Sequence, residues 1–290
     1  MKVIALLLGV VLLICCTGCA ASLETADIAA TTLPAYQFTS LLCEGTGLTV
    51  QRVITENVSC LHDYSLSVSQ VRTIEAASLV VTSGAGLEEF MADLLFGKTV
   101  IDASAGIPLL ESCHDHEQEH DGHHHDTDPH IWLDPQNAAV MAENIALGLI
   151  KAHPHHEERI QKNLVELQTK LRELLDYGKK QLSELRCREL ITFHDGFAYF
   201  AQAFDLTILA AVEEESGSEA SARELIELIE LVRKHQLPAV FTEENGSASA
   251  AAIISVETGA RQFTLSMAMS GEDYFAAMYQ NINTVKEALG

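Results

Sequence analysis

The chain has few basic residues: 18 Lys and Arg stand against 41 Asp and Glu, which gives a formal net charge of −23. Binding to nucleic acid phosphates depends on Lys and Arg, so no nucleic acid partner is expected. An acidic surface instead favours the capture of cations. With 290 residues and 48% hydrophobic content, the chain is long enough for two compact lobes and is not globally disordered.

Several catalytic and redox motifs are absent. Beyond the first 19 residues no CxxC pair occurs, which argues against a thiolate zinc site and a thioredoxin-like motif. The sequence also contains no glycine-rich phosphate loop and no Ser-His-Asp nucleophile elbow. The spacing of the four later cysteines leaves any disulfide pairing open, and we interpret them mostly as small buried hydrophobes: Cys43, Cys60, Cys113 and Cys187.

A long hydrophobic run is also missing, apart from a short one at the N-terminus. The apolar stretch at residues 3–14 follows Lys2, and it is much shorter than the roughly 20 residues that span a bilayer. It is typical of a secretory signal peptide, predicted over residues 1–18. The small residues that close it resemble a bacterial lipoprotein cleavage site, with Cys19 as the lipidated residue. We therefore expect an extracytoplasmic protein anchored to the bacterial cell membrane, with a periplasmic or secreted protein as the alternative.

Strand-like runs alternate with helical patterns in both halves of the chain, which predicts parallel sheets built from βαβ units. Strands are predicted at residues 28–32, 48–54, 78–82, 98–102, 189–193, 206–212, 239–243 and 262–266. Helices are predicted at residues 67–77, 87–96 and 272–289, and others begin near Pro34, Gly196, Ser218 and Ser247.

Between the two strand-rich halves the apolar spacing is helical. Pro135 begins one helix, Pro154 interrupts the pattern, and leucines and isoleucines then recur every three or four positions over residues 155–185. A helix of that length extends about 45 Å and acts as a rigid spacer. The sequence thus predicts an α/β protein with two lobes, residues 19–153 and 187–290, joined by a helix over residues 154–186.

Histidine is concentrated in one polar segment. Seven of the 13 histidines lie between Cys113 and Pro135, and six of them stand in a run without apolar residues: His114, His116, His120, His123, His124 and His125. Imidazole suits borderline metals such as zinc, and so polar a tract cannot bury itself. Residues 113–128 are predicted to form a mobile loop that binds metal with low affinity, or a solvated loop that binds it only incidentally.

Other histidine patterns are decoys. His116 and His120 satisfy the HExxH pattern of zinc proteases, but their segment has no apolar face and runs into Asp121-Gly122, so we do not expect the helix which that chemistry needs. His235 lies near a predicted helix C-terminus, where a cationic imidazole is favourable. Three further histidines beside Pro154 are expected to face solvent: His153, His155 and His156.

Three histidines differ because each follows or opens a sheet-like segment. His62 stands in SCLHDY, His130 in DPHIWLDP and His194 in ITFHDGF. Ligand groups gather beyond the carboxyl ends of parallel strands, so two histidines from the first lobe and one from the second would converge between the lobes. Each alone is more typical of a structural hydrogen-bonding residue. Neighbouring acids are available to orient the three rings: Asp63, Asp128 and Asp195.

These motifs, in this order, resemble the zinc and manganese substrate-binding lipoproteins of bacterial ABC importers, the ZnuA/TroA-like group called cluster A-I. The resemblance covers the whole mature chain and rests on LHDYSLSVSQVRTIEAASLVVTSGAGLEEF, the histidine-rich loop into DPHIWLDP, TFHDGFAYFA, FTEENGSASAAAIISVETGA and YFAAMYQNINTVKEAL. It implies two lobes, a long backbone helix and an interlobe metal site with His62, His130 and His194 as ligands. A histidine as the third ligand is typical of zinc-type members, and manganese is the less expected cargo.

The chain differs from the family's usual pattern at one position. The family usually supplies an Asp near the end of the last strand, where this chain reads LSMAMSG with Ser266. Zinc prefers four ligands, and a Ser hydroxyl is a poor one. The fourth position is left to water, Glu243, Glu244 or a loop histidine. We favour water, with Glu243 orienting a ligand or occasionally binding the metal.

The resemblance implies a non-enzymatic, monomeric receptor that captures zinc and delivers it to the membrane permease subunit of an ABC importer. A secreted zinc hydrolase is the alternative, because three histidines plus water also describe a hydrolytic site. An enzyme would need a general base beside the metal, and the sequence offers no motif for one.

Overall fold

The computed structural model describes residues 26–290 apart from residues 59–60, 62–63, 112–126, 213–219, 245, 247 and 270. Its strands form two four-stranded parallel sheets. The first sheet has the order β2-β1-β3-β4, with β1 (Ile28–Ala30), β2 (Val50–Arg52), β3 (Leu79–Thr82) and β4 (Thr99–Asp102). The second has the order β6-β5-β7-β8, with β5 (Glu189–Thr192), β6 (Thr207–Ala211), β7 (Ala239–Glu243) and β8 (Arg261–Leu265). All eight predicted strands are therefore confirmed, and the two sheets share one strand order.

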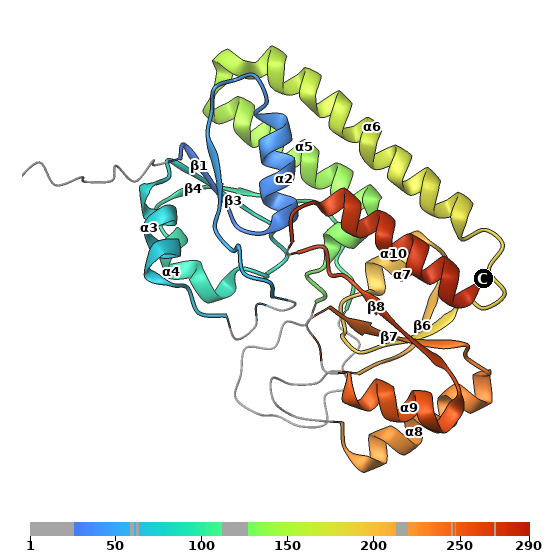
Figure 1. Ribbon diagram of the computed structural model, residues 1–290. Coiled ribbons are helices and arrows are strands. Elements are labelled where there is room, and N and C mark those ends of the chain that lie inside the picture. Colours follow the sequence, from blue (N-terminus) through green and yellow to red (C-terminus); the bar gives the residue numbers. More distant parts are fainter. Residues whose placement is uncertain are drawn as a thin grey trace, which may run out of the picture.

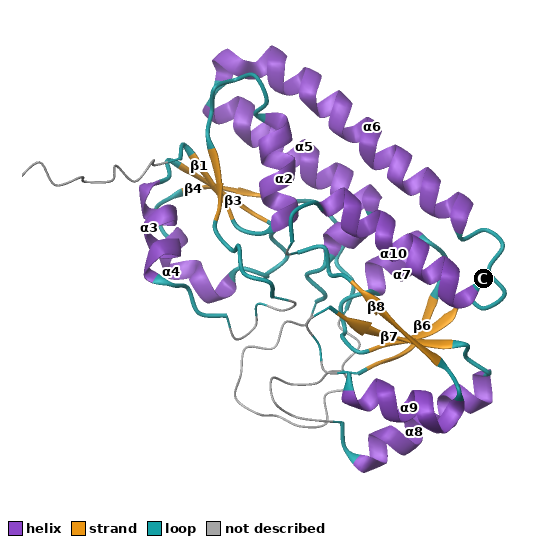
Figure 2. Cartoon of the chain, viewed as in Figure 1, coloured by secondary structure: helices purple, strands orange, loops and turns teal. Residues whose placement is uncertain are grey.

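Helices cover both faces of each sheet (Figures 1 and 2). The first sheet lies between α3 (Val68–Ala76) with α4 (Ala92–Leu95) on one side and α2 (Leu33–Leu42) with α5 (Pro135–Ala152) on the other. The second lies between α8 (Ala222–His235) with α9 (Ser249–Thr258) and α7 (Ala198–Ala203) with α10 (Tyr274–Leu289). Among the described residues, no helix has the length and apolar character that a membrane span requires.

Local sequence signals explain where several of these helices begin. Ser67 caps α3 and Ser221 caps α8, and in each case the residue three positions later, Gln70 or Glu224, completes a capping box. Asp134 caps α5 directly before Pro135, whose fixed φ suits a first helical position. These contacts satisfy backbone N–H groups that the first turn of a helix leaves unpaired.

The predicted linking helix is α6 (Glu157–Gln181), which follows a 3-10 turn at Pro154–His156. It is shorter than the predicted helix over residues 154–186, because it begins after the 3-10 turn and its C-cap is Leu182. Its 25 residues extend about 38 Å. Its apolar face packs against α5 and α2 of the first lobe and α10 of the second (Figure 1). The helix is thus a packed spine for both lobes, and one continuous core runs through them.

The helix predicted at residues 87–96 is wrong in part. The chain forms a 3-10 turn at Glu89–Met91 before the single turn of α4. The physical reason is the side chain of Glu88, which folds back onto the preceding loop and accepts hydrogen bonds from the N–H groups of Ser83 and Gly84. These bonds hold the chain in a tight turn where an amphipathic pattern alone predicts a helix.

The remaining histidines and cysteines partly follow expectation. His155 is exposed, but His153 and His156 are half-buried, which corrects their predicted solvent-facing placement. His235 ends α8 as predicted, and its Nδ1 lies 3.0 Å from a carboxylate oxygen of Glu189. Cys43 is buried and Cys187 is half-buried, and both are free thiols. Cys60 and Cys113 lie outside the described residues.

Candidate metal site between the lobes

His130 is held in a fixed orientation before α5. The residue is 2% exposed, and Asp128 Oδ1 lies 2.8 Å from both the His130 backbone nitrogen and ring Nδ1. Asp128 is in turn tied to the second lobe, because the Tyr199 hydroxyl donates to its carbonyl oxygen at 3.2 Å. A ring whose Nδ1–H donates to a carboxylate presents the lone pair of Nε2, which is the arrangement a metal ligand needs.

His194 follows directly after β5 in the second lobe. Thr192 pairs with Phe241 of the neighbouring strand β7, so two residues further on His194 stands beside Glu243. The distance from His194 Nδ1 to Glu243 Oε2 is 3.6 Å, and the Thr192 hydroxyl donates to the His194 carbonyl oxygen. Glu243 is therefore the acid that faces this ring, as the sequence analysis suggested for an orienting group.

The two histidine rings are in contact although they come from different lobes. Their centroids lie 5.2 Å apart with planes at 81°, and His130 also packs edge-on against Trp132. Gly196 makes this approach possible. A Cβ atom at position 196 would lie 2.6 Å from Met267 Cε, 2.7 Å from His194 Cδ2 and 2.9 Å from His130 Cε1. Any larger residue there would push the rings apart.

The segment after β8 joins the two lobes beside these rings. Met267 accepts a hydrogen bond from the Trp132 indole N–H at 2.7 Å, and Met269 accepts one from the backbone N–H of Leu33 at 3.1 Å. Ser266 begins the segment, and its hydroxyl donates to Glu244 Oε2 at 3.0 Å. The backbone at Ala268 has a positive φ of 51°, so the segment turns sharply between the two lobes.

The structure thus brings five predicted residues into one region: His130, His194, Glu243, Glu244 and Ser266. His62 with Asp63, the histidines at positions 114–125 and Cys19 lie outside the described residues. Within the part of the chain that is described, no group of three or more His, Cys, Asp and Glu side chains is placed to hold a metal ion. Sequence reasoning missed Gly196, Trp132 and Met267, although the HDG motif and the chain's only tryptophan mark two of them.

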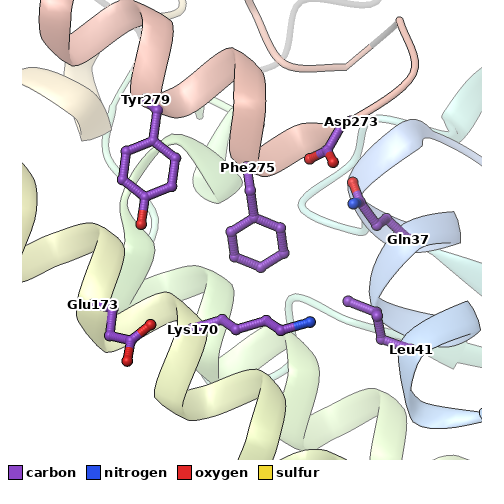
Figure 3. Close-up of a pocket in the computed structure, with 7 residues that line it drawn as sticks. All are labelled: Gln37, Leu41, Lys170, Glu173, Asp273, Phe275 and Tyr279. Carbon is purple, nitrogen blue, oxygen red and sulfur yellow. The ribbon is translucent and has the colours of Figure 1, made fainter.

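A separate pocket of about 380 Å³ lies where α2, α6 and α10 meet (Figure 3). Its lining mixes both charges with apolar groups and includes none of the histidines: Gln37, Leu41, Lys170, Glu173, Asp273, Phe275 and Tyr279. It is therefore distinct from the candidate metal site.

Comparison with known proteins places the chain among zinc-uptake proteins. Residues 28–288 match the family described as the periplasmic component A of the zinc-uptake complex, ZnuA. The zinc-binding lipoprotein AdcA of Streptococcus pneumoniae (strain ATCC BAA-255 / R6) is 30% identical over 99% of this chain and 61% of AdcA. A putative metal-binding protein of Treponema pallidum (strain Nichols) is 28% identical over 78% of this chain and 76% of that protein. The chain thus spans about three fifths of AdcA.

Solved structures give the same result. A crystal structure of ZnuA is 26% identical with a TM-score of 0.79, covering 91% of this chain and 100% of that one. The Zn(II)-bound ZnuA-like domain of Streptococcus pneumoniae AdcA is 27% identical with a TM-score of 0.76, covering 92% of this chain and 99% of that one. The predicted architecture of two lobes joined by a long helix is confirmed.

The comparisons also decide the class of protein. The matched family is a periplasmic, zinc-binding component of zinc uptake, and relatives are named as lipoproteins. This family is non-enzymatic, so family membership confirms the prediction that the chain is no enzyme. The alternative of a secreted zinc hydrolase is not supported by these relatives. The chain belongs to the ZnuA family of zinc-uptake proteins.

Proposed function

We propose that this protein is the extracytoplasmic zinc receptor of an ABC importer, which captures zinc and delivers it to a membrane permease. The observation that carries the proposal is the pair of histidine rings from different lobes, in contact over Gly196 and each with Nδ1 facing a carboxylate. Ions held between two lobes couple binding to the arrangement of those lobes, which a permease can recognise.

The proposed zinc ligands are His62, His130 and His194. Imidazole nitrogen binds zinc at about 2.0–2.1 Å, and an acid on the opposite ring nitrogen fixes the ring and strengthens the bond. Asp128 serves His130 in this way, and Glu243 is the acid nearest the other ring, with its Oε2 3.6 Å from His194 Nδ1. The Ser266 hydroxyl donates its proton to Glu244 and is not proposed as a ligand.

Further parts of the proposal rest on sequence. Cys19 carries the lipid anchor that holds the receptor at the membrane near its permease. The histidines at positions 114–125 add low-affinity sites that raise the local zinc concentration. Zinc is the main cargo and manganese a weaker one, because imidazole ligands suit borderline metals better than hard ones. The receptor acts as a monomer.

A competition titration of purified metal-free protein against a chromogenic zinc chelator tests this function. We expect one tight zinc site in the full chain, and His194→Ala should weaken it by about a hundredfold or more, since each factor of ten is about 1.4 kcal/mol. His235→Ala is the matched control, because that imidazole also faces a carboxylate but lies at the far end of α8. Equal zinc affinity in His194→Ala and His235→Ala would reject the proposed site.

A further inference from the structure

The pocket of about 380 Å³ between α2, α6 and α10 is built by both lobes and by the helix that joins them (Figure 3). Pockets of about 300–1,000 Å³ at the junction of two domains are a common place for small ligands. The size and position of this pocket therefore suit a small molecule, and its lining shares no residue with the candidate metal site.

The side of the pocket where α2 meets α10 is fixed by hydrogen bonds. Gln37 Oε1 accepts from the backbone N–H of Tyr274 at 2.6 Å, and the Tyr274 ring packs edge-on against Phe38 with centroids 5.0 Å apart. Asp273 caps α10, because its Oδ1 accepts from the Ala276 N–H at 3.1 Å. A ligand entering a wall that is already ordered has little ordering entropy to overcome.

The middle of the pocket is apolar. Leu41 on α2 and Phe275 on α10 both line it and are half-buried, so part of each side chain stays accessible. Phe275 is supported from behind by the rings of Tyr274 and Phe38, at centroid distances of 5.3 Å and 6.5 Å. Accessible apolar surface in a concave site favours a ligand that covers it with an apolar group.

Opposite charges lie on two sides of this apolar surface. Lys170 extends from α6 below the Phe275 ring toward α2, and Asp273 lies on the other side of the ring (Figure 3). Within the described part of the chain, the structure records no ion pair between Lys170 and Asp273, although both line one cavity. A purely anionic or purely cationic ligand would meet a like charge in this pocket. A ligand that carries both charges could satisfy the two side chains together.

We propose that this pocket binds an α-amino acid with an apolar side chain. Its carboxylate would accept from the Lys170 ammonium, its own ammonium would donate to Asp273, and its side chain would cover Leu41 and Phe275. The proposal adds a second ligand site to the protein and does not depend on the proposed zinc ligands.

Isothermal titration of the metal-free full chain with L-leucine tests the proposal. L-Leucinamide lacks the carboxylate and N-acetyl-L-leucine lacks the ammonium, so each should bind about tenfold more weakly than L-leucine or worse. Lys170→Gln and Asp273→Asn should each weaken L-leucine binding by about tenfold. Asn is also a good helix cap, so Asp273→Asn keeps the start of α10. Lys162→Gln is the matched control, because Lys162 is an exposed lysine of the same helix that pairs with Glu166 outside the pocket.

Unchanged L-leucine binding in Lys162→Gln, together with the losses in the two pocket variants, supports the proposal. No heat of binding with L-leucine at millimolar concentration overturns it. Equal binding of L-leucine, L-leucinamide and N-acetyl-L-leucine also overturns it, as does an equal loss in Lys162→Gln and Lys170→Gln. Thermal unfolding shows that each variant is folded, and zinc competition with Lys170→Gln should give unchanged zinc affinity.

Discussion

Two buried glutamates beside the third strands of the two sheets have different partners. β3 and β7 both take the third position in their sheets, Glu88 follows the loop after β3, and Glu243 ends β7. Both are buried, at 5% and 9% exposure. Glu88 accepts from the Thr31 hydroxyl and the Ser83 N–H through Oε1 and from the Gly84 N–H through Oε2. Glu243 instead faces an imidazole.

The donors account for the difference. Gly84, Ala85 and Gly86 all have positive φ, so the chain turns back sharply after β3. The N–H groups of Ser83 and Gly84 reach the Glu88 carboxylate, whereas the Ala85 N–H donates to Ser104. The carboxylate of Glu88 is thereby satisfied within its own lobe and fastens β1 to the loop after β3. In the second sheet the Glu243 carboxylate lies beside the imidazole of His194, which follows the neighbouring strand β5. The hydrogen-bond donors around each carboxylate therefore distinguish Glu88, in the loop after β3, from Glu243, the last residue of β7.

The largest expected effect comes from removing Glu88. Glu88→Ala leaves two backbone N–H groups and the Thr31 hydroxyl without their acceptor, which should lower the free energy of unfolding by about 3 kcal/mol. Urea unfolding of metal-free protein at pH 6 measures it. Glu243→Ala, the matched variant, should lower stability less and zinc affinity more. If both variants lost stability and zinc affinity in the same proportion, the distinction between a structural Glu88 and a zinc-supporting Glu243 would be wrong.

The buried Glu88 should also make the stability of the protein depend on pH. Burial raises the pKa of Glu88 from its ordinary 4.5 to about 7, against the opposing effect of its hydrogen bonds. The folded protein then holds this proton more tightly than the unfolded chain, so the stabilisation is complete below pH 4.5 and is lost as pH rises through 7. The loss amounts to at most roughly 3 kcal/mol, at 1.36 kcal/mol per pKa unit.

Urea unfolding of the metal-free protein between pH 5 and pH 8 measures this dependence. Glu88→Gln cannot ionise, and its unfolding free energy should fall less over that range than that of the unaltered chain. Parallel pH profiles for the two proteins would show that Glu88 does not titrate there.

A pair of glycines gives a smaller effect. Gly84 has φ +83° and a Cβ there would lie 1.9 Å from Asp102 Oδ1, whereas Gly196 borders the histidine rings. Gly84→Ala should cost about 2 kcal/mol of stability through backbone strain and crowding. Gly196→Ala should lower zinc affinity by about tenfold because the rings must shift. Denaturant unfolding and zinc competition on both variants measure the loss of stability and the loss of zinc affinity. A larger affinity loss in Gly84→Ala than in Gly196→Ala, with the larger stability loss in Gly196→Ala, would contradict the prediction.

The smallest effect on the tight site is expected from deleting residues 114–125. The proposed ligands His62, His130 and His194 all lie outside the deleted segment of the sequence, so the tight affinity should stay within about threefold. Additional weak binding should disappear, because the deleted residues hold six histidines. Isothermal titration with excess zinc counts both classes of site. Loss of the tight class would place a ligand in the deleted segment.

The sequence predicted the parts of the fold that depend on local signals. Alternating apolar runs located the strands. The helix predicted over residues 67–77 is α3, capped by Ser67, and the helix expected to begin near Ser218 is α8, which begins at Ala222 after its cap Ser221. Position after a strand singled out His194, which lies against His130. Those predictions needed only neighbouring residues and the rule that ligand groups collect beyond strand ends.

The missed features depend on contacts between distant residues. The pairing of Glu244 with Ser266 follows from the register of β7 on β8, which neither strand's own residues specify. In LEEF, nothing local indicates that Glu88 turns inward while Glu89 stays exposed, so the broken helix at residues 87–96 was not foreseen. The bond from Trp132 to Met267 joins residues 135 positions apart.

The most direct test of the account is a crystal structure of the zinc-loaded full chain with anomalous data at the zinc edge. We predict one fully occupied zinc ion between the lobes, about 2.0–2.1 Å from the Nε2 atoms of His130 and His194, with His62 also bound. Strong zinc density found only at residues 114–125, with His130 and His194 bound to no metal, would contradict the account.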